Sequence, residues 1–367
     1  MSILTRVPRP LSTSNLVAPD RETLMRFARA AHDGAPVVAW LESALAGFHG
    51  AAHAVTLCNG FWGLVLAIRA LAMPGAVPGR TDVLMPSLTY RRMADVAAWA
   101  GLRPRFCEVD PATLAPSAAT MRAGLSAEVG LLLAVHPIVG VCDVAGLEAL
   151  AAEVKVPLLF DSVESVFEHV GVGEMEGGKV GSFGAAECFS LHASKLLNGC
   201  EGGYVTTNDP VLAGRLAAMR DGLGPDGMDA RLNRLHAAMA LAALDGLDDQ
   251  VARNRVRYEA YRRGLPPGLR LLPFEEGSSF KTVVVEVMPA WPRSRAETLS
   301  ALNAANVLAR AYYHPPLHRK AMGYPHVPAD LPGTDDLAER FMLLPCGDHV
   351  EFEDIGAVLG LLRELVA

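Results

Sequence analysis

Paired cysteines are absent from this 367-residue sequence. No two cysteines form a C-x-x-C pair, and the intervals between them are long and irregular. Such spacing argues against a disulfide framework and against a zinc site, so we expect reduced thiols, no bound metal and a cytoplasmic protein. The cysteines are Cys58, Cys107, Cys142, Cys188, Cys200 and Cys346.

The sequence also lacks a block of basic residues and an apolar run of membrane-spanning length. Its formal net charge is -7 and its isoelectric point is near 5.9. Proteins that bind nucleic acid or anionic membranes usually carry clustered Lys and Arg, so we expect neither partner. Residues 1–15 hold no apolar stretch like that of a signal peptide, and the most apolar window, Val129–Val141, is too short to cross a bilayer.

Apolar residues are nevertheless abundant. The chain is 51% hydrophobic and 20% charged, which suits a globular protein with a large core. Short apolar runs alternate with longer amphipathic segments from Ala54–Leu57 to Gly203–Thr206. Strands that alternate with helices predict an α/β fold, in which helices cover both faces of a mostly parallel sheet.

The length of the chain is about twice that of an ordinary domain, which favours two domains. A helical pattern over Arg231–Arg263 stops at the G-L-P-P-G segment Gly264–Gly268. Beyond it, the strand-like segments Lys281–Val287 and Val307–Tyr313 and the helical segment Phe352–Leu365 predict a smaller α+β domain. We therefore predict three parts, which are an N-terminal arm (1–19), a large domain (20–264) and a small C-terminal domain (265–367).

The strongest chemical signal is a lysine at the end of a predicted strand. The strand-like Glu187–Leu191 leads into His-Ala-Ser-Lys195, and an E-G-G turn at Glu201–Gly203 follows. A lysine there can face the cleft outside the carboxyl edge of the sheet, and partial desolvation makes its amine a nucleophile for an aldehyde. The hydroxyl of Ser190 is placed to reach a phosphate. The alternative is an exposed lysine in an ordinary loop.

A second signal is an acidic residue at the end of another apolar strand. Pro157–Phe160 is followed directly by Asp161. The cofactor pyridoxal phosphate needs an anion beside its ring nitrogen, which keeps that nitrogen protonated. The alternatives are a helix N-cap and a magnesium ligand.

Two weaker signals concern a phosphate and a flat ring. The strand–turn–helix segment Thr56–Gly63 offers backbone N–H groups at Gly60 and Phe61, but it matches neither the Rossmann nor the Walker pattern. Tyr90, at the end of the segment P-S-L-T-Y, suits stacking on a ring. The alternatives are an ordinary turn and a tyrosine of the core or surface.

Taken in order, these pieces resemble the DegT/DnrJ/StrS family of sugar aminotransferases over nearly the whole chain. The matching motifs are Asn59–Leu64, Pro86–Tyr90, Gly101–Asp110, Phe160–Glu164, Gly178–Gly184 and Ser190–Gly203, with further landmarks at Tyr313–His318 and Leu344–Cys346. The resemblance implies a fold-type-I pyridoxal-phosphate transferase, with the cofactor bound in the large domain.

The resemblance also implies roles for single residues. Lys195 would form the Schiff base with pyridoxal phosphate and move the proton, Asp161 would pair with the ring nitrogen, and Glu164 would lie near the ring oxygen. The implied cofactor-binding set is Gly60, Phe61, Tyr90, Asp161, Glu164, Ser190 and Lys195.

A further set is implied at the substrate or at the edge of a homodimer whose active sites are shared between chains. Asp229 stands where the family has an Asn that reaches the neighbouring subunit's phosphate. A phosphate repels a carboxylate, so either Asp229 turns away or Arg231 compensates. The set is His192, Asn198, Asp229, Arg231, Tyr313 and His318.

The function implied is transamination from glutamate or glutamine to a keto sugar, with a nucleotide-linked keto-deoxysugar as the expected acceptor. One alternative acceptor is an aminocyclitol ketone, an inosose. Another alternative is a cofactor-binding regulator without turnover, because Phe61, Trp62 and Asp229 depart from the family pattern.

Overall fold

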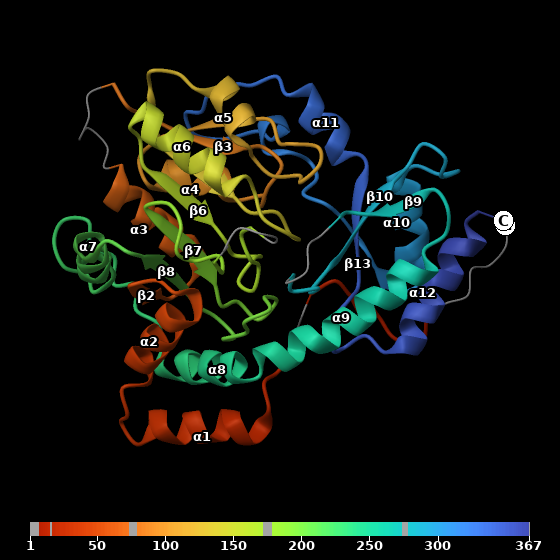
Figure 1. Ribbon diagram of the computed structural model, residues 1–367, viewed down its shortest axis with the longest axis horizontal. Coiled ribbons are helices and arrows are strands. Elements are labelled where there is room, and N and C mark those ends of the chain that lie inside the picture. Colours follow the sequence, from red (N-terminus) through yellow and green to blue (C-terminus); the bar gives the residue numbers. More distant parts are fainter. Residues whose placement is uncertain (1–6, 15–16, 73–78, 172–177, 274–277, 367) are drawn as a thin grey trace.

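A mostly parallel sheet of seven strands organises the larger part of the molecule (Figure 1). The computed structural model describes residues 7–14, 17–72, 79–171, 178–273 and 278–366. The strand order is β2-β8-β7-β6-β5-β3-β4, and β8 runs antiparallel to both of its neighbours. The strands are β2 (His53–Leu57), β3 (Asp82–Pro86), β4 (Arg103–Cys107), β5 (Val129–Val135), β6 (Leu158–Asp161), β7 (Ala186–Ser190) and β8 (Gly203–Thr207).

Helices cover both faces of this sheet, as the alternation of elements predicts. Successive residues of β5 point to opposite faces. Leu131 and Leu133 pack in one core with α3 (Gly60–Leu71), α4 (Met93–Trp99) and α7 (Pro210–Arg220). Leu132 packs in another core with α5 (Ala118–Gly124) and α6 (Val144–Val154). A strand that is buried on both faces therefore reads as an uninterrupted apolar run.

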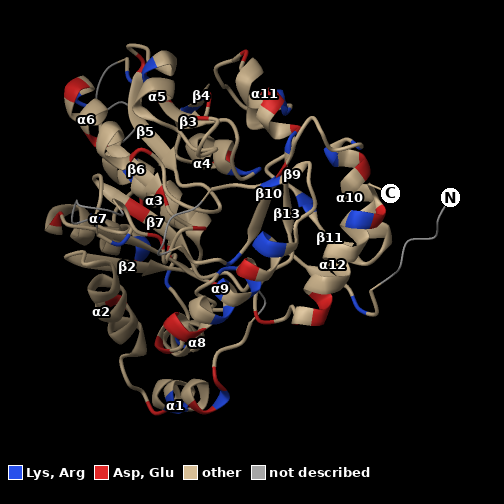
Figure 2. Ribbon diagram, turned by 45° about the vertical axis from the view of Figure 1, so that its right-hand side comes forward, with Lys and Arg blue, Asp and Glu red and all other residues tan. Residues whose placement is uncertain are grey.

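Three further helices pack together at the end of the sheet near β2. They are α1 (Arg21–His32), α2 (Val37–His49) and α8 (Arg234–Asp245) (Figure 1). Acidic and basic residues are interspersed on outer helices such as α1 (Figure 2). No helix within the described ranges combines the length and the hydropathy that a membrane span requires.

The C-terminal part of the chain forms a smaller α+β unit. Its antiparallel sheet has the order β12-β13-β10-β9 and packs with two helices. The elements are β9 (Leu269–Leu271), β10 (Val283–Val287), α10 (Arg295–Ala304), β12 (Arg310–Ala311), β13 (Phe341–Leu344) and α12 (Phe352–Glu364). The segment with η1 (Leu317–Arg319) and α11 (Pro332–Ala338) lies against the large sheet, where Glu108 accepts hydrogen bonds from the first turn of α11.

The N-terminal segment reaches the small unit. Strand β1 (Leu11–Ser12) pairs in parallel with β11 (Val307–Leu308). Residues 1–6 and 15–16 of the predicted arm lie outside the described residues. Contact between segments so far apart in the sequence leaves no local pattern, so the sequence did not predict this pairing.

Two expectations for single elements are wrong. The predicted helix over Arg231–Arg263 is two helices, α8 and α9 (Leu247–Gly264), which meet at Gly246. Asn233 caps the start of α8 by accepting from the N–H of Leu235 at 2.8 Å, and α8 ends where Gly246 leaves the helical conformation, with φ of -102° and ψ of 12°. The predicted strand Val307–Tyr313 is split into β11 and β12, because β11 pairs with β1 whereas β12 pairs with β13.

Candidate active site

The predicted chemical residues meet at the carboxyl edge of the large sheet, where open α/β sheets bind their ligands. Tyr90 follows β3, Asp161 ends β6 and Ser190 ends β7. They line a cavity of about 840 Å³, which also receives residues from the small unit. The sequence-predicted residues that line it are Gly60, Phe61, Tyr90, Asp161, Glu164, Ser190, His192, Lys195 and Tyr313.

Lys195 is presented by a tight loop after β7. Its backbone N–H donates to the carbonyl of His192 at 2.8 Å, and the N–H of Ala193 donates to the carbonyl of Cys200 at 2.8 Å. The Lys195 side chain is 18% exposed, and its Nζ donates to Oε1 of Glu164. The loop therefore holds a partly desolvated amine inside the cavity.

Asp161 is a buried carboxyl group on the cavity wall. Its Oδ1 accepts from the backbone N–H of Val163 at 3.0 Å. Burial raises the pKa of Asp161 to about 6, against the opposing effects of the Val163 N–H and Lys195. A cation beside this carboxyl would relieve the cost of burying it, and a protonated ring nitrogen is such a cation.

Glu164 lies between two ammonium groups. Its Oε1 accepts from Lys195 and its Oε2 accepts from Lys281, which stands just before β10. Burial by itself raises the pKa of the Glu164 carboxyl, but the two lysines outweigh it and lower that pKa to about 2. Lys281 also lines the cavity. Sequence reasoning missed it as a site residue, because it placed Lys281 only at the start of a strand.

The loop after β6, which carries Glu164, is held in place by Glu187 of β7. Glu187 is fully buried and accepts from the hydroxyl of Ser162 at 2.6 Å. Its other oxygen accepts from the N–H groups of Gly181 and Phe183 at 2.7 and 2.9 Å. This network ties the G-K-x-G-S-F-G segment to the loop after β6.

Helix α3 points its N-terminus at the cavity. Asn59 caps it by accepting from the N–H of Trp62 at 2.9 Å. Gly60 and Phe61 begin the helix, where backbone N–H groups have no partner within the helix and attract anions. The Arg92 guanidinium lies over the ring of Phe61, 4.3 Å from the centroid of that ring. Because the Phe61 side chain has no hydrogen-bond donor, only its backbone N–H can bind an anion.

Pyridoxal phosphate matches this set of groups. An amine is present for its aldehyde, a buried carboxyl for its ring nitrogen and a helix N-terminus for its phosphate. Tyr90 lines the same cavity and is 45% exposed, so its ring is available for stacking. The residues present therefore fit the cofactor that the sequence suggested.

Four predicted residues do not line the cavity. The amide of Asn198 is buried and donates to the carbonyl of Val17 at 2.8 Å, so it anchors the N-terminal segment. The His318 side chain is also buried, with Nδ1 2.7 Å from the hydroxyl of Ser87. The remaining two are Asp229 and Arg231, which form an exposed ion pair at 2.8 Å.

The model of the DegT/DnrJ/EryC1/StrS aminotransferase family matches residues 25–363. The chain belongs to this family. It is therefore a transaminase, and aminotransferases of the family depend on pyridoxal phosphate.

Individual relatives match most of the chain. Protein Rv3402c of Mycobacterium tuberculosis is 31% identical over 85% of this chain and 78% of its own length. The UDP-N-acetyl-3-dehydro-alpha-D-glucosamine 3-aminotransferase of Acidithiobacillus ferrooxidans is 27% identical over 88% and 87%. The crystal structure of DesI, determined with its TDP-sugar product, superposes with a TM-score of 0.87 at 31% identity over 98% and 94%.

Proposed function

We propose that this aminotransferase moves an amino group from glutamate or glutamine to a keto sugar, and that the acceptor is a nucleotide-linked keto-deoxysugar. The observation that carries the proposal is the shared cavity of Lys195, Asp161 and Glu164 at the carboxyl edge of the sheet. Similarity to proteins named for UDP- and TDP-sugars supports the acceptor class.

The charge of the cavity suits an acceptor that carries phosphate groups. Arg91 and Arg92 line it from the loop after β3, and Arg310 lines it from β12. Guanidinium groups bind phosphates through paired N–H donors. Arg92 also pairs with Asp95 at 3.2 Å, which limits its freedom to move.

Each residue has a distinct task in this proposal. When bound, the cofactor supplies an electron-accepting ring that stabilises charge on the carbon bearing the transferred amine. Lys195 carries the cofactor and moves a proton to and from that carbon. Asp161 holds the proton on the ring nitrogen, and the N–H groups of Gly60 and Phe61 donate to the phosphate. Tyr90 shields one face of the ring from water.

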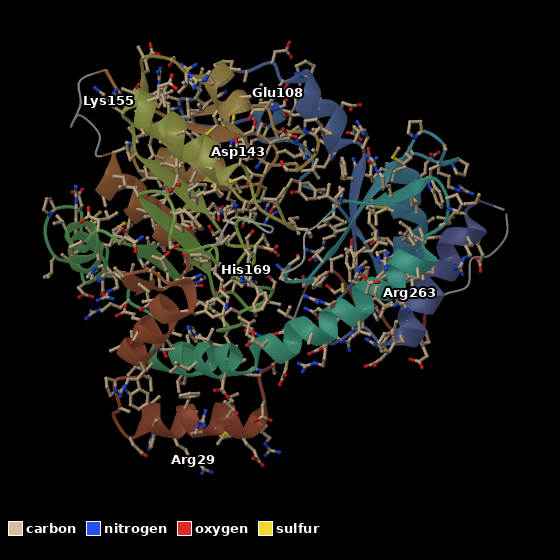
Figure 3. The ribbon with its side chains drawn as sticks, in the orientation of Figure 1. Arg29, Glu108, Asp143, Lys155, His169 and Arg263 are labelled. Atoms are coloured by element: carbon tan, nitrogen blue, oxygen red, sulfur yellow. The ribbon has the colours of Figure 1, made fainter. Side chains whose placement is uncertain are left out.

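Covalent trapping tests the position of the cofactor. After supplementation with pyridoxal phosphate and reduction with borohydride, we expect mass spectrometry to find the adduct on the peptide that contains Lys195. Lys195→Met should lose both the adduct and turnover. The matched control is Lys155→Met, at the exposed end of α6 (Figure 3), which should retain both. An adduct on Lys281 in the wild-type protein would contradict the assignment.

A panel of acceptors tests the substrate class. The protein is first converted with glutamate or glutamine, which should bleach the absorbance band of the bound cofactor. Keto-deoxysugar nucleotides should then restore the band, whereas the corresponding free sugars and inososes should not. Recovery with inososes alone would replace the proposed acceptor by an aminocyclitol ketone.

A further inference from the structure

A second lysine, Lys281 of the small unit, lines the same cavity as Lys195. The Lys281 side chain is 6% exposed, and its Nζ donates to the same carboxylate of Glu164 that accepts from Lys195. Lys281 precedes β10 of the small sheet, whereas Glu164 and Lys195 follow strands of the large sheet. The two sheets thus meet through an ion pair inside the cavity.

A buried ammonium group needs a counter-ion, because burial penalises its charged form. Burial lowers the pKa of Lys281, and Lys195 lowers it further, while Glu164 acts in the opposite direction. Other titratable groups that face this pair from the surrounding elements are Asp161, Glu168, Lys195, Tyr312 and Tyr313. Glu164 bonds directly to Lys281 and is therefore its closest counter-ion.

The ion pair between Lys281 and Glu164 matters most when Lys195 changes its charge. In its proposed role, Lys195 carries a proton at one stage and is neutral at another. At the neutral stage it no longer balances Glu164. A buried carboxylate without a cation, close to a second carboxyl at Asp161, tends to take up a proton. Glu164 would then compete for the proton that Lys195 must deliver.

We propose that Lys281 is a positioning residue that keeps Glu164 ionised and in place throughout the reaction cycle. It contributes a fixed positive charge that does not depend on the state of Lys195. Glu164 consequently stays an acceptor, and the amine of Lys195 finds the same partner each time it is released. This inference rests on the proposed role of Lys195 as the cofactor lysine.

The pH dependence of turnover distinguishes this role from a merely structural ion pair. In Lys281→Met holoenzyme, we expect turnover near pH 8 to fall about ten- to a hundredfold, by analogy with the loss of residues that position metal ligands. We also expect a new acid limb, because without Lys281 no lysine charge opposes the burial that raises the pKa of Glu164 when Lys195 is neutral. Below that pKa, Glu164 is protonated and the rate falls. Lys281→Arg should keep the wild-type profile.

A double variant identifies the titrating group. Lys281→Met with Glu164→Gln should lack the new acid limb, because no carboxyl remains at that position. A wild-type profile in Lys281→Met, or an acid limb that persists in the double variant, would overturn the proposal. Borohydride labelling of the wild type on Lys195 is measured in parallel. Its absence would instead refute the proposed function.

Urea unfolding of the cofactor-free protein tests the proposal independently of enzyme activity. Glu164→Gln leaves the buried Lys281 without its carboxylate, and Lys281→Met leaves Glu164 with Lys195 as its remaining cation. Urea unfolding measures the loss in free energy of unfolding for each variant. We expect the sum of the losses in the two single variants to exceed the loss in the double variant, which is the signature of coupling. Additive effects would show that the pair is not formed and would also overturn the proposal.

Discussion

Asp161 ends β6 and Glu164 follows in the next loop, and the pKa values of these two carboxyl groups move in opposite directions. Burial raises the pKa of Asp161 to about 6, whereas Lys195 and Lys281 overcome burial at Glu164 and lower its pKa to about 2. Divergent pKa values in neighbouring groups are typical of active sites. Asp161 thus has room for a cationic partner, whereas the charge of Glu164 is already balanced by Lys195 and Lys281.

Replacing Asp161 tests this arrangement through stability as well as turnover. An unfolded Asp has a pKa near 3.9. The folded state therefore binds more protons between about pH 4 and pH 6, and its free energy of unfolding falls as the pH rises through that window. Asp161→Asn does not titrate. We expect the stability of this cofactor-free variant relative to the wild type to rise between about pH 4 and pH 6 and then to stay constant, measured by urea unfolding.

Turnover of the same variant should change in the opposite sense. Asp161→Asn should lower turnover about a hundredfold or more, because the ring nitrogen loses its anion. Two results would count against the assignment. One is a stability difference that does not vary with pH, and the other is turnover within a few fold of the wild type.

At the scale of elements, the sequence predicts the large sheet well because strands such as β5 and β6 are apolar runs and β6 and β7 end in chemical motifs. Strand β6 lies within a residue of the predicted Pro157–Phe160, and β8 extends the predicted Gly203–Thr206 by one residue. The short strands β9 and β13 were not predicted, since β9 has only three residues, too few to show a period, and β13 pairs with the distant strands β10 and β12.

The same limit explains which site residues could be found. Lys195, Asp161 and Tyr90 stand in motifs that are continuous in the sequence, and the cavity brings them together. Lys281 stands alone at the start of an apolar strand, so only the folded contact between the two sheets reveals it. The exposed pair of Asp229 and Arg231 leaves its implied contact with a neighbouring subunit a prediction.

Helix α3 gives a prediction at this scale, because its first residue is tightly packed. A Cβ atom on Gly60 would lie 3.2 Å from the carbonyl oxygen of Phe189 and from Cβ of Ser190. Gly60→Ala should therefore shift the N-terminal N–H groups and weaken the binding of pyridoxal phosphate about tenfold, or about 1.4 kcal/mol. An absorbance titration of the cofactor measures this change.

Gly47→Ala in α2 is the matched control. A Cβ atom there meets nothing within 4 Å. Its cofactor affinity should equal that of the wild type, and its free energy of unfolding should rise by about 1 kcal/mol, because Ala favours a helix interior. Equal cofactor affinity in both variants would mean that α3 does not hold the phosphate.

At the scale of the whole molecule, the N-terminal segment joins the small unit to the cavity. Arg9 donates to the carbonyl of His349 at 2.9 Å, and β1 pairs with β11. Thr13 and Ser14, just beyond β1, line the cavity. The active site is thus enclosed by the large sheet, the small sheet and the start of the chain.

We propose a homodimer, as the family resemblance implies, in which Arg231 compensates the charge of Asp229 at the partner's site. Sedimentation should give twice the mass of the 39.0 kDa chain. Co-expressing Lys195→Met and Arg231→Ala with different tags should restore about a quarter of the sites, because one site of each mixed dimer is intact. Recovery no greater than the sum of the two separate variants would contradict shared sites.

The loop that carries Lys195 also carries Cys200, whose thiol is open to chemical labelling. In a single copy of the chain Cys200 is exposed, Cys58 is half-buried, and the other four cysteines are buried. Burial raises the thiol pKa of Cys58, Cys107, Cys188 and Cys346. A maleimide dye would therefore attach first at Cys200, whose carbonyl is bonded to this loop. Its fluorescence could follow cofactor capture and release in real time, without altering a residue of the cavity wall.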